Sequence, residues 1–309
     1  MPERGGPTTQ SGILYQNSVT ALHLGRLCDE AARPAADRVV QVRVEAPEDV
    51  DDTVVWYSDG RVAYIQAKER LDVGGAVWTG LWEAFAAQFR REEFQNGRDE
   101  LRLVVSEGCD DHIALKEVCD RTRSHHGAQD WLESLSVQQR RLKVSLERLV
   151  ASKLPLTEEV LRDFLSHVYV ELSPLSQIER DWLPNLMPRA SVDAHTLFRL
   201  LRDRVGGEAR KRGLFTAQRL RSSLENEDQV VFAAATDMEG LRAAVHNCGA
   251  LLRQHKSTLG NTNLHVARSV VAEIVGWTLD PSVERRVGFL HGPCGTRKDG
   301  GHARCPYSA

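Results

Sequence analysis

The segment around residue 50 carries residue types suited to metal-assisted hydrolysis. Asp51 and Asp52 precede a run rich in Val, Trp and Tyr, and Gln66 and Lys68 end the next such run. Carboxylate and amide oxygens are hard ligands that bind Mg²⁺ or Mn²⁺, and a neighbouring ammonium neutralises developing charge or orients a water molecule. The segment therefore predicts a metal site able to hydrolyse a phosphodiester. The alternative is a surface hairpin whose Asp and Lys side chains are simply solvated.

A β-hairpin is the element that must position these side chains. Its two apolar runs flank Ser58-Asp59-Gly60-Arg61, and an Asp-Gly pair between such runs indicates a tight turn. Because side chains alternate along a strand, Gln66 and Lys68 share a face. A strict two-residue loop would place Asp51 opposite Lys68, whereas a bulge or a three-residue loop would select Asp52. The hairpin alone leaves both aspartates open.

The run from Glu45 to Asp52, followed by Ile65-Gln66-Ala67-Lys68, resembles the PD-(D/E)xK restriction-endonuclease-like superfamily, in the variant with Gln in place of the second acidic residue. More narrowly, it is similar to the double-stranded DNA nuclease domain at the N-terminus of many bacterial antiphage proteins. That group opens with a helix carrying Gly-x-x-Tyr-Gln, and residues 12–16 read Gly-Ile-Leu-Tyr-Gln. The resemblance covers roughly the first third to half of the chain.

The resemblance implies which residues form the site. In the family the aspartate that leads into the apolar strand binds the metal, which favours Asp52 and keeps Asp51 second. Gln66 is the next metal ligand implied, and Lys68 assists the water. Glu45 and Gln16 are further candidates, although Glu45 equally fits an exposed strand end and Gln16 a helix residue bonded to backbone.

The resemblance also implies an activity. It predicts a deoxyribonuclease that uses Mg²⁺ or Mn²⁺ to cut double-stranded DNA in antiphage defence. The alternatives are a catalytically silent DNA-binding or regulatory remnant of a nuclease-NTPase defence protein, or a nonfunctional one. A homo-oligomer is compatible with each of these possibilities.

The remaining pattern predicts an α/β/α nuclease core followed by a mainly α-helical region. Residues 12–32, 78–94 and 113–122 are expected to be helices, and 39–44 and 101–105 strands. From residue 131 to about 224 helical spacing dominates, interrupted by a short predicted strand at 168–172. The predicted domains are 1–128 (nuclease-like), 129–270 (mainly helical) and 271–309 (a degenerate phosphate loop and tail).

The predicted phosphate loop follows the apolar run that begins at Val287. Gly292 and Lys298 fit the Walker A pattern, but Arg297 takes the place of its second glycine and Asp299 that of its hydroxyl residue. No ATP binding is therefore expected from Gly292 to Asp299. In the resembling proteins a large STAND-type NTPase begins near this point, so we expect a truncated or frameshifted chain.

A basic stretch between residues 199 and 221 has two interpretations. It could contact a DNA backbone, or it could be a solvated helical face with internal salt bridges, which is the commoner outcome for a run of charges.

Composition limits the class of protein. The chain has 309 residues, 41% of them hydrophobic and 27% charged, with a net charge of -3, which is typical of a globular protein and not of one that coats nucleic acid nonspecifically. Its six scattered cysteines contain no Cys-x-x-Cys pair and predict reduced thiols. Without a signal peptide pattern or a membrane-length apolar run, the sequence predicts a cytoplasmic protein with no membrane partner.

Overall fold

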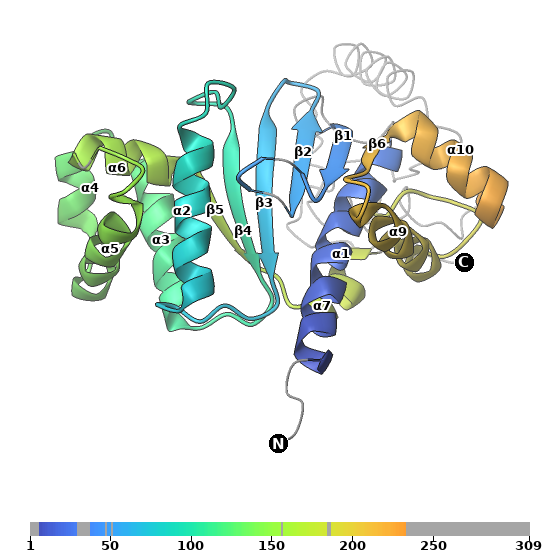
Figure 1. Cartoon of the computed structure of the whole chain (residues 1–309), viewed down its shortest axis with the longest axis horizontal. Helices are drawn as coiled ribbons and strands as arrows, with labels where there is room; N and C mark the ends of the chain where they lie inside the picture. Colours follow the sequence, from blue (N-terminus) through green and yellow to red (C-terminus); the bar gives the residue numbers. More distant parts are fainter. Residues whose placement is uncertain are drawn as a thin grey trace, which may run out of the picture. The chain divides into compact units, whose positions relative to one another are not determined.

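The computed structural model describes residues 6–29, 38–46, 48–50, 52–155, 157–183 and 187–232. The chain divides into two units after residue 239, and all described residues belong to the first. They form a six-stranded mixed sheet with helices on both faces (Figure 1). The predicted α/β architecture is confirmed at this level.

The strands follow the order β5-β4-β3-β2-β1-β6 across the sheet. Their bounds are β1 (Val39–Val44), β2 (Thr53–Tyr57), β3 (Val62–Lys68), β4 (Glu100–Val105), β5 (Val168–Leu172) and β6 (Leu214–Thr216). Strands β3, β4 and β5 are parallel, while β2, β1 and β6 add antiparallel pairs. The carboxyl ends of β3, β4 and β5 and the start of β2 therefore meet at one edge of the sheet.

One face of the sheet is covered by α2 (Ala76–Phe89), α3 (Asp110–Ser124), α5 (Val137–Val150) and α6 (Glu158–Ser166), with α4 (Ala128–Ser134) beside them. Trp78, Trp82 and Phe85 recur at helical spacing along α2, and all three are fully buried. Their rings pack edge to face with one another and with Phe164 of α6. These aromatics thus form the core, as the spacing predicts.

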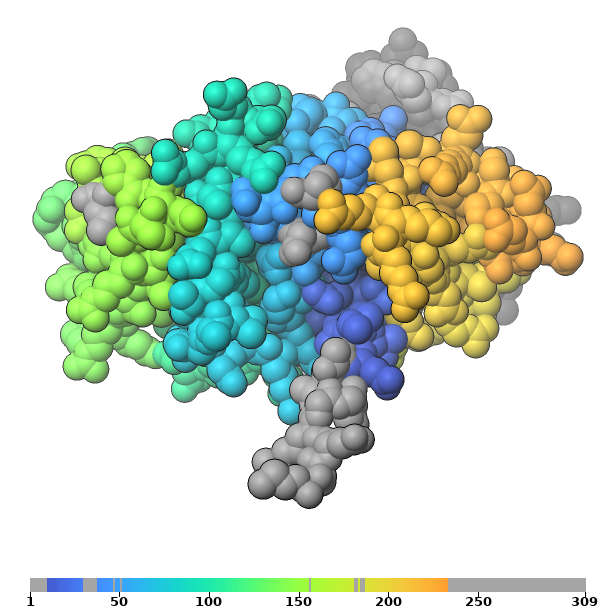
Figure 2. All heavy atoms as spheres, viewed as in Figure 1, coloured from blue at the N-terminus to red at the C-terminus, as the bar shows by residue number. Residues whose placement is uncertain are grey.

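The other face is covered by α1 (Gly6–Cys28), α9 (Ala194–Ala209) and α10 (Ala217–Asp228). Helix α1 buries Val19, Leu22 and Leu24 in a core that also holds Val42 and Ile65 of the sheet. The short helix α7 (Leu175–Gln177) and a π-helical segment, Ile178–Trp182, connect β5 to this side. In the space-filling view α4–α6 and α9–α10 form the two ends of the visible face (Figure 2).

The hairpin has a three-residue loop. Trp56 pairs with Val62, and the amide of Tyr57 donates to the carbonyl of Arg61 at 2.9 Å, so residues 58–60 form the loop. Gly60 closes it with φ +86°, a left-handed conformation that glycine adopts without strain. The strict two-residue loop was therefore wrong, because the left-handed glycine adds one residue to the turn.

The helical spacing predicted from residue 131 onward begins with two separate helices, α4 and α5 (Val137–Val150). Ser136 caps the N-terminus of α5 with a capping box. Its hydroxyl oxygen accepts from the backbone amide of Gln139, and the side-chain oxygen of Gln139 accepts from the backbone amide of Ser136. Strands β5 and β6, which lie beyond the predicted boundary at residue 128, belong to the same sheet as β1–β4. The α/β layer therefore continues well past that point.

Candidate active site

Three candidate residues lie in a row across neighbouring strands. Thr53 pairs with Val44 on one side and Ile65 on the other. Extending both registers by one position places Asp52 beside Glu45 and directly opposite Gln66. The backbone amide of Glu45 donates to the carbonyl of Asp52 at 3.2 Å, which supports this continuation. The three-residue loop therefore selects Asp52, in agreement with the resemblance.

Asp52 and Lys68 form a direct ion pair. The Nζ atom of Lys68 lies 3.0 Å from Asp52 Oδ2, and the Ala67 amide donates to the same oxygen at 2.9 Å. The Asp52 side chain is 8% exposed and that of Lys68 22%. Both contacts use Oδ2, and neither involves the second carboxylate oxygen, Asp52 Oδ1. One oxygen is thus held by the protein and the other remains available at the sheet edge.

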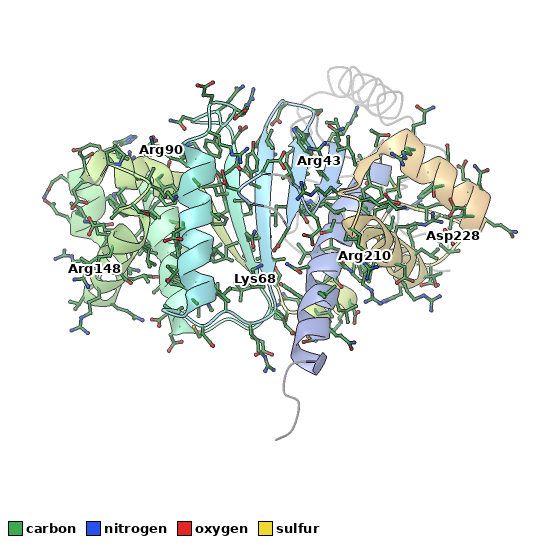
Figure 3. The ribbon with its side chains drawn as sticks, in the orientation of Figure 1. Arg43, Lys68, Arg90, Arg148, Arg210 and Asp228 are labelled. Atoms are coloured by element: carbon green, nitrogen blue, oxygen red, sulfur yellow. The ribbon has the colours of Figure 1, made fainter. Side chains whose placement is uncertain are left out.

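Gln66 and Lys68 point to the same face, as strand alternation predicts. Gln66 is 6% exposed and pairs with Leu103 of β4. Lys68 is the last residue of β3 and lies at its carboxyl end (Figure 3). Its carbonyl accepts from the amide of Ser106, just beyond β4. The neighbouring parallel strand therefore fixes the end of β3.

The Gly-x-x-Tyr-Gln segment lies in α1 and anchors the site indirectly. The Tyr15 hydroxyl donates to the carbonyl of Ser173 at 2.8 Å, and burial followed by the charges of Glu171 and Glu69 raises the pKa of Tyr15, which keeps it a neutral donor. The half-buried Gln16 accepts from the Thr20 hydroxyl through its carbonyl. The signature thus connects α1 to the residue that follows β5.

Sequence reasoning missed a contact between α1 and the start of β2. The hydroxyl oxygens of Thr20 and Thr53 lie 2.6 Å apart, and both residues are buried. Thr53 directly follows Asp52, so this bond fixes the backbone that carries the carboxylate. The sequence signal is faint: Thr20 stands one helical turn after Gln16.

Glu45 is placed less favourably than Asp52. Glu45 is exposed and has φ +45°, which turns its chain out of the regular strand. Asp51 lies outside the described residues, as do residues 271–309 with the Gly292 to Asp299 loop. The roles of these residues stay predictions.

The side chains at this site have the oxygen donors that a hard divalent cation prefers, but they supply few ligands. Asp52 Oδ1 and the Gln66 amide are oxygen donors of the kind that Mg²⁺ accepts, and Mg²⁺ usually retains several waters beside one or two carboxylates. Within the described ranges no group of three His, Cys, Asp or Glu side chains could hold a metal. Any cation bound here would depend on one described carboxylate.

The basic stretch is partly used within the protein. Arg204 of α9 pairs with Glu227 and Asp228 of α10 at 2.6 and 2.5 Å, and Arg221 of α10 donates to the carbonyl of Cys28 at the end of α1. These contacts join the helices of one layer. The ion pairs support the salt-bridged interpretation for Arg204.

Two further predictions concern the cysteines and membrane-spanning helices. Cys28, Cys109 and Cys119 are thiols rather than disulfides. Of the helices that the structure describes, none combines the length and apolar character needed to cross a membrane.

Comparisons with known proteins identify no family for this chain. No protein-family model and no curated protein matches the sequence. A structure of the Acinetobacter baumannii Cap4 SAVED/CARF-domain containing receptor with the cyclic trinucleotide 3'3'3'-cAAA aligns with 14% identity and a TM-score of 0.41, over 70% of this chain and 48% of that one. A second structure of the same Acinetobacter baumannii receptor, whose description mentions no cyclic trinucleotide, aligns with 13% identity and a TM-score of 0.41, over 69% of this chain and 47% of that one. The chain spans about half the length of these solved chains.

Proposed function

We propose that the chain is a metal-dependent DNA endonuclease whose centre is the Asp52, Gln66 and Lys68 row. The observation that carries the proposal is the ion pair between Asp52 Oδ2 and Lys68 Nζ at 3.0 Å. The register that pairs Thr53 with Ile65, extended by one position, places Gln66 opposite Asp52. A carboxylate, an amide and an ammonium thereby converge at the carboxyl end of β3, where the Lys68 side chain is 22% exposed.

In this proposal Asp52 Oδ1 and the Gln66 carbonyl oxygen hold Mg²⁺ or Mn²⁺. The cation, when bound, polarises the phosphoryl oxygen and makes water a better nucleophile. Asp52 Oδ2 keeps the Lys68 ammonium beside the reacting phosphate. Lys68 then orients the attacking water or neutralises the charge that develops on the phosphate. The bond between Thr20 and Thr53 holds Asp52 in position throughout.

The substrate and biological role follow from the resemblance described above. The acidic strand start, the Gln-x-Lys end and the Tyr-Gln helix together favour double-stranded DNA as the substrate and antiphage defence as the setting. Since the whole chain carries a net charge of -3, we expect DNA binding to depend on local contacts and on the cation, which lowers repulsion between carboxylate and phosphate.

Plasmid cleavage with Mg²⁺ or Mn²⁺ tests the proposal. We expect Lys68→Ala and Asp52→Ala each to reduce the cleavage rate by about 100-fold or more, the usual loss when one group that stabilises the transition state is removed. Lys116→Ala is the matched control, because Lys116 forms an exposed pair with Asp120 on α3 worth under about 1 kcal/mol. Wild-type protein that cuts with neither metal, or a Lys68→Ala variant that cuts normally, would refute the proposal.

A second candidate function is a DNA-binding or regulatory protein that does not cut. The observation that favours it is that Lys68 already neutralises the charge of Asp52, so the burial of this carboxylate does not require a metal. A gel-shift assay with the same plasmid fragments separates the two: binding by wild type without cleavage in either metal supports the silent form.

A further inference from the structure

A recessed polar cavity lies on the opposite face of β3 from Gln66. Its volume is about 80 Å³, which exceeds the roughly 10–15 Å³ of such space that one water molecule needs. The polar side chains that line it are His23 and Arg26 of α1, Arg102 of β4, Glu171 of β5, and Ser173. Apolar side chains from α1, β3, β4 and the π-helical segment complete the wall. The cavity is thus built from α1, the parallel half of the sheet and the segment that follows β5.

Two of these side chains are buried without a protein partner for a polar atom. His23 is 7% exposed and Ser173 1%, and neither His23 Nδ1 nor Ser173 Oγ has a hydrogen-bond partner among the described protein atoms. A buried polar atom without a partner destabilises the fold by about 1–3 kcal/mol. Both residues line the same cavity, so a polar group bound there would give these atoms a partner.

The cavity favours an anion once Glu171 moves away. Arg26 and Arg102 supply two guanidinium groups, against the carboxylates of Glu171 in the lining and of Glu100, which is bonded to Arg102. Arg102 is bonded to Glu171 at 2.5 Å and to Glu100 at 2.6 Å. The side chain of Glu171 is 39% exposed, so it can turn into solvent and leave a face of Arg102 to another oxyanion. Guanidinium pairs planar or tetrahedral oxyanions through two parallel hydrogen bonds.

We propose that this cavity is a binding site for a tetrahedral oxyanion of the phosphate type. Arg102 exchanges Glu171 for the anion, while His23 Nδ1 and Ser173 Oγ donate to its oxygens. The site does not depend on the proposed nuclease activity. It is connected to α1 through Ser173, whose carbonyl accepts from Tyr15. Occupation of the cavity would therefore stabilise the contact between α1 and the sheet.

Titration calorimetry and thermal unfolding of the full chain with inorganic phosphate test the site, with chloride at equal ionic strength as the control for screening. We expect phosphate to raise the melting temperature of wild type in a saturable way. Ser173→Ala should weaken phosphate binding roughly tenfold, as the loss of one hydrogen bond to a charged group does. Glu171→Gln should strengthen it, because the competing carboxylate is gone.

Matched controls make the outcome decisive. Ser145→Ala alters an exposed serine of α5 and Glu133→Gln an exposed glutamate of α4, so both should bind phosphate as wild type does. A nucleoside 5'-monophosphate tested against the nucleoside shows whether a terminal phosphate also enters, and a response to either phosphate supports the site. Absence of binding at millimolar phosphate, or equal binding by wild type, Ser173→Ala and Glu171→Gln, would overturn it.

Discussion

Gln66 stands in the proposed metal site where the PD-(D/E)xK pattern, which this segment resembles, has its second acidic residue. We predict that Gln66→Glu melts at a lower temperature than wild type in chelator, because a second carboxylate then lies beside Asp52 in a position that is 6% exposed. Mn²⁺ should raise the melting temperature of Gln66→Glu more than that of wild type, since one more charged ligand binds the cation.

The comparison has an internal control. Gln218 is exposed on α10, so Gln218→Glu should respond to Mn²⁺ as wild type does. An equal metal response from Gln66→Glu and wild type would mean that residue 66 contributes no ligand.

His23 makes stability depend on pH. Burial first, and then the charges of Arg26 and Arg102, lower the pKa of His23 well below its ordinary value near 6.5. Below pH 6.5 the unfolded chain therefore binds a proton that the folded protein does not, and stability falls as pH falls. The contribution is at most about 1.4 kcal/mol per pH unit. Melting temperatures from pH 7 to pH 5 should fall less steeply for His23→Asn than for wild type, and parallel curves would contradict this.

At the residue scale, the sequence predicted that Gln66 and Lys68 share a face, because alternation along one strand is a local property. It could not choose between Asp51 and Asp52 by counting, since Gly60 adds a residue to the turn. The cavity around His23 was also out of reach. Its lining comes from positions as distant as 19 and 178, which only the sheet pairing brings together.

Two glycines in different elements should respond oppositely to alanine. Gly60 has φ +86°, and an added Cβ would lie 3.1 Å from Arg98 Nη1. Gly60→Ala should therefore lower the free energy of unfolding by about 1–2 kcal/mol. Gly80 is exposed inside α2 with nothing within 4 Å of an added Cβ, so Gly80→Ala should raise it by about 0.4–1 kcal/mol. Urea unfolding of both variants checks the signs, and stabilisation by Gly60→Ala would contradict the three-residue loop.

Element types were more predictable than element pairing. Spacing and β-branched residues identified β1, β4 and β5 closely because those signals are local. The split between α4 and α5 depends on one cap at Ser136, a signal easily hidden inside a continuous apolar period. That β5 joins β4 across an interval containing α3 to α6 could not be predicted from local pattern, because parallel pairing is a long-range contact.

The sheet makes the predicted boundary at residue 128 testable for the molecule as a whole. A chain ended at 128 loses β5, whose five paired positions cover the edge of β4, and α9, which packs on α1 in the second core. Buried residues such as Leu197 and Phe164 are lost with them. We predict that this chain shows no cooperative thermal transition, whereas a chain ended at residue 239, the end of the first unit, retains one. The physical reason is that the parallel half of the sheet would present an apolar face and an unpaired strand edge to water.

Circular dichroism melts with sedimentation analysis measure both chains. A soluble monomer of residues 1–128 that unfolds cooperatively would instead show that the nuclease-like part is an independent domain.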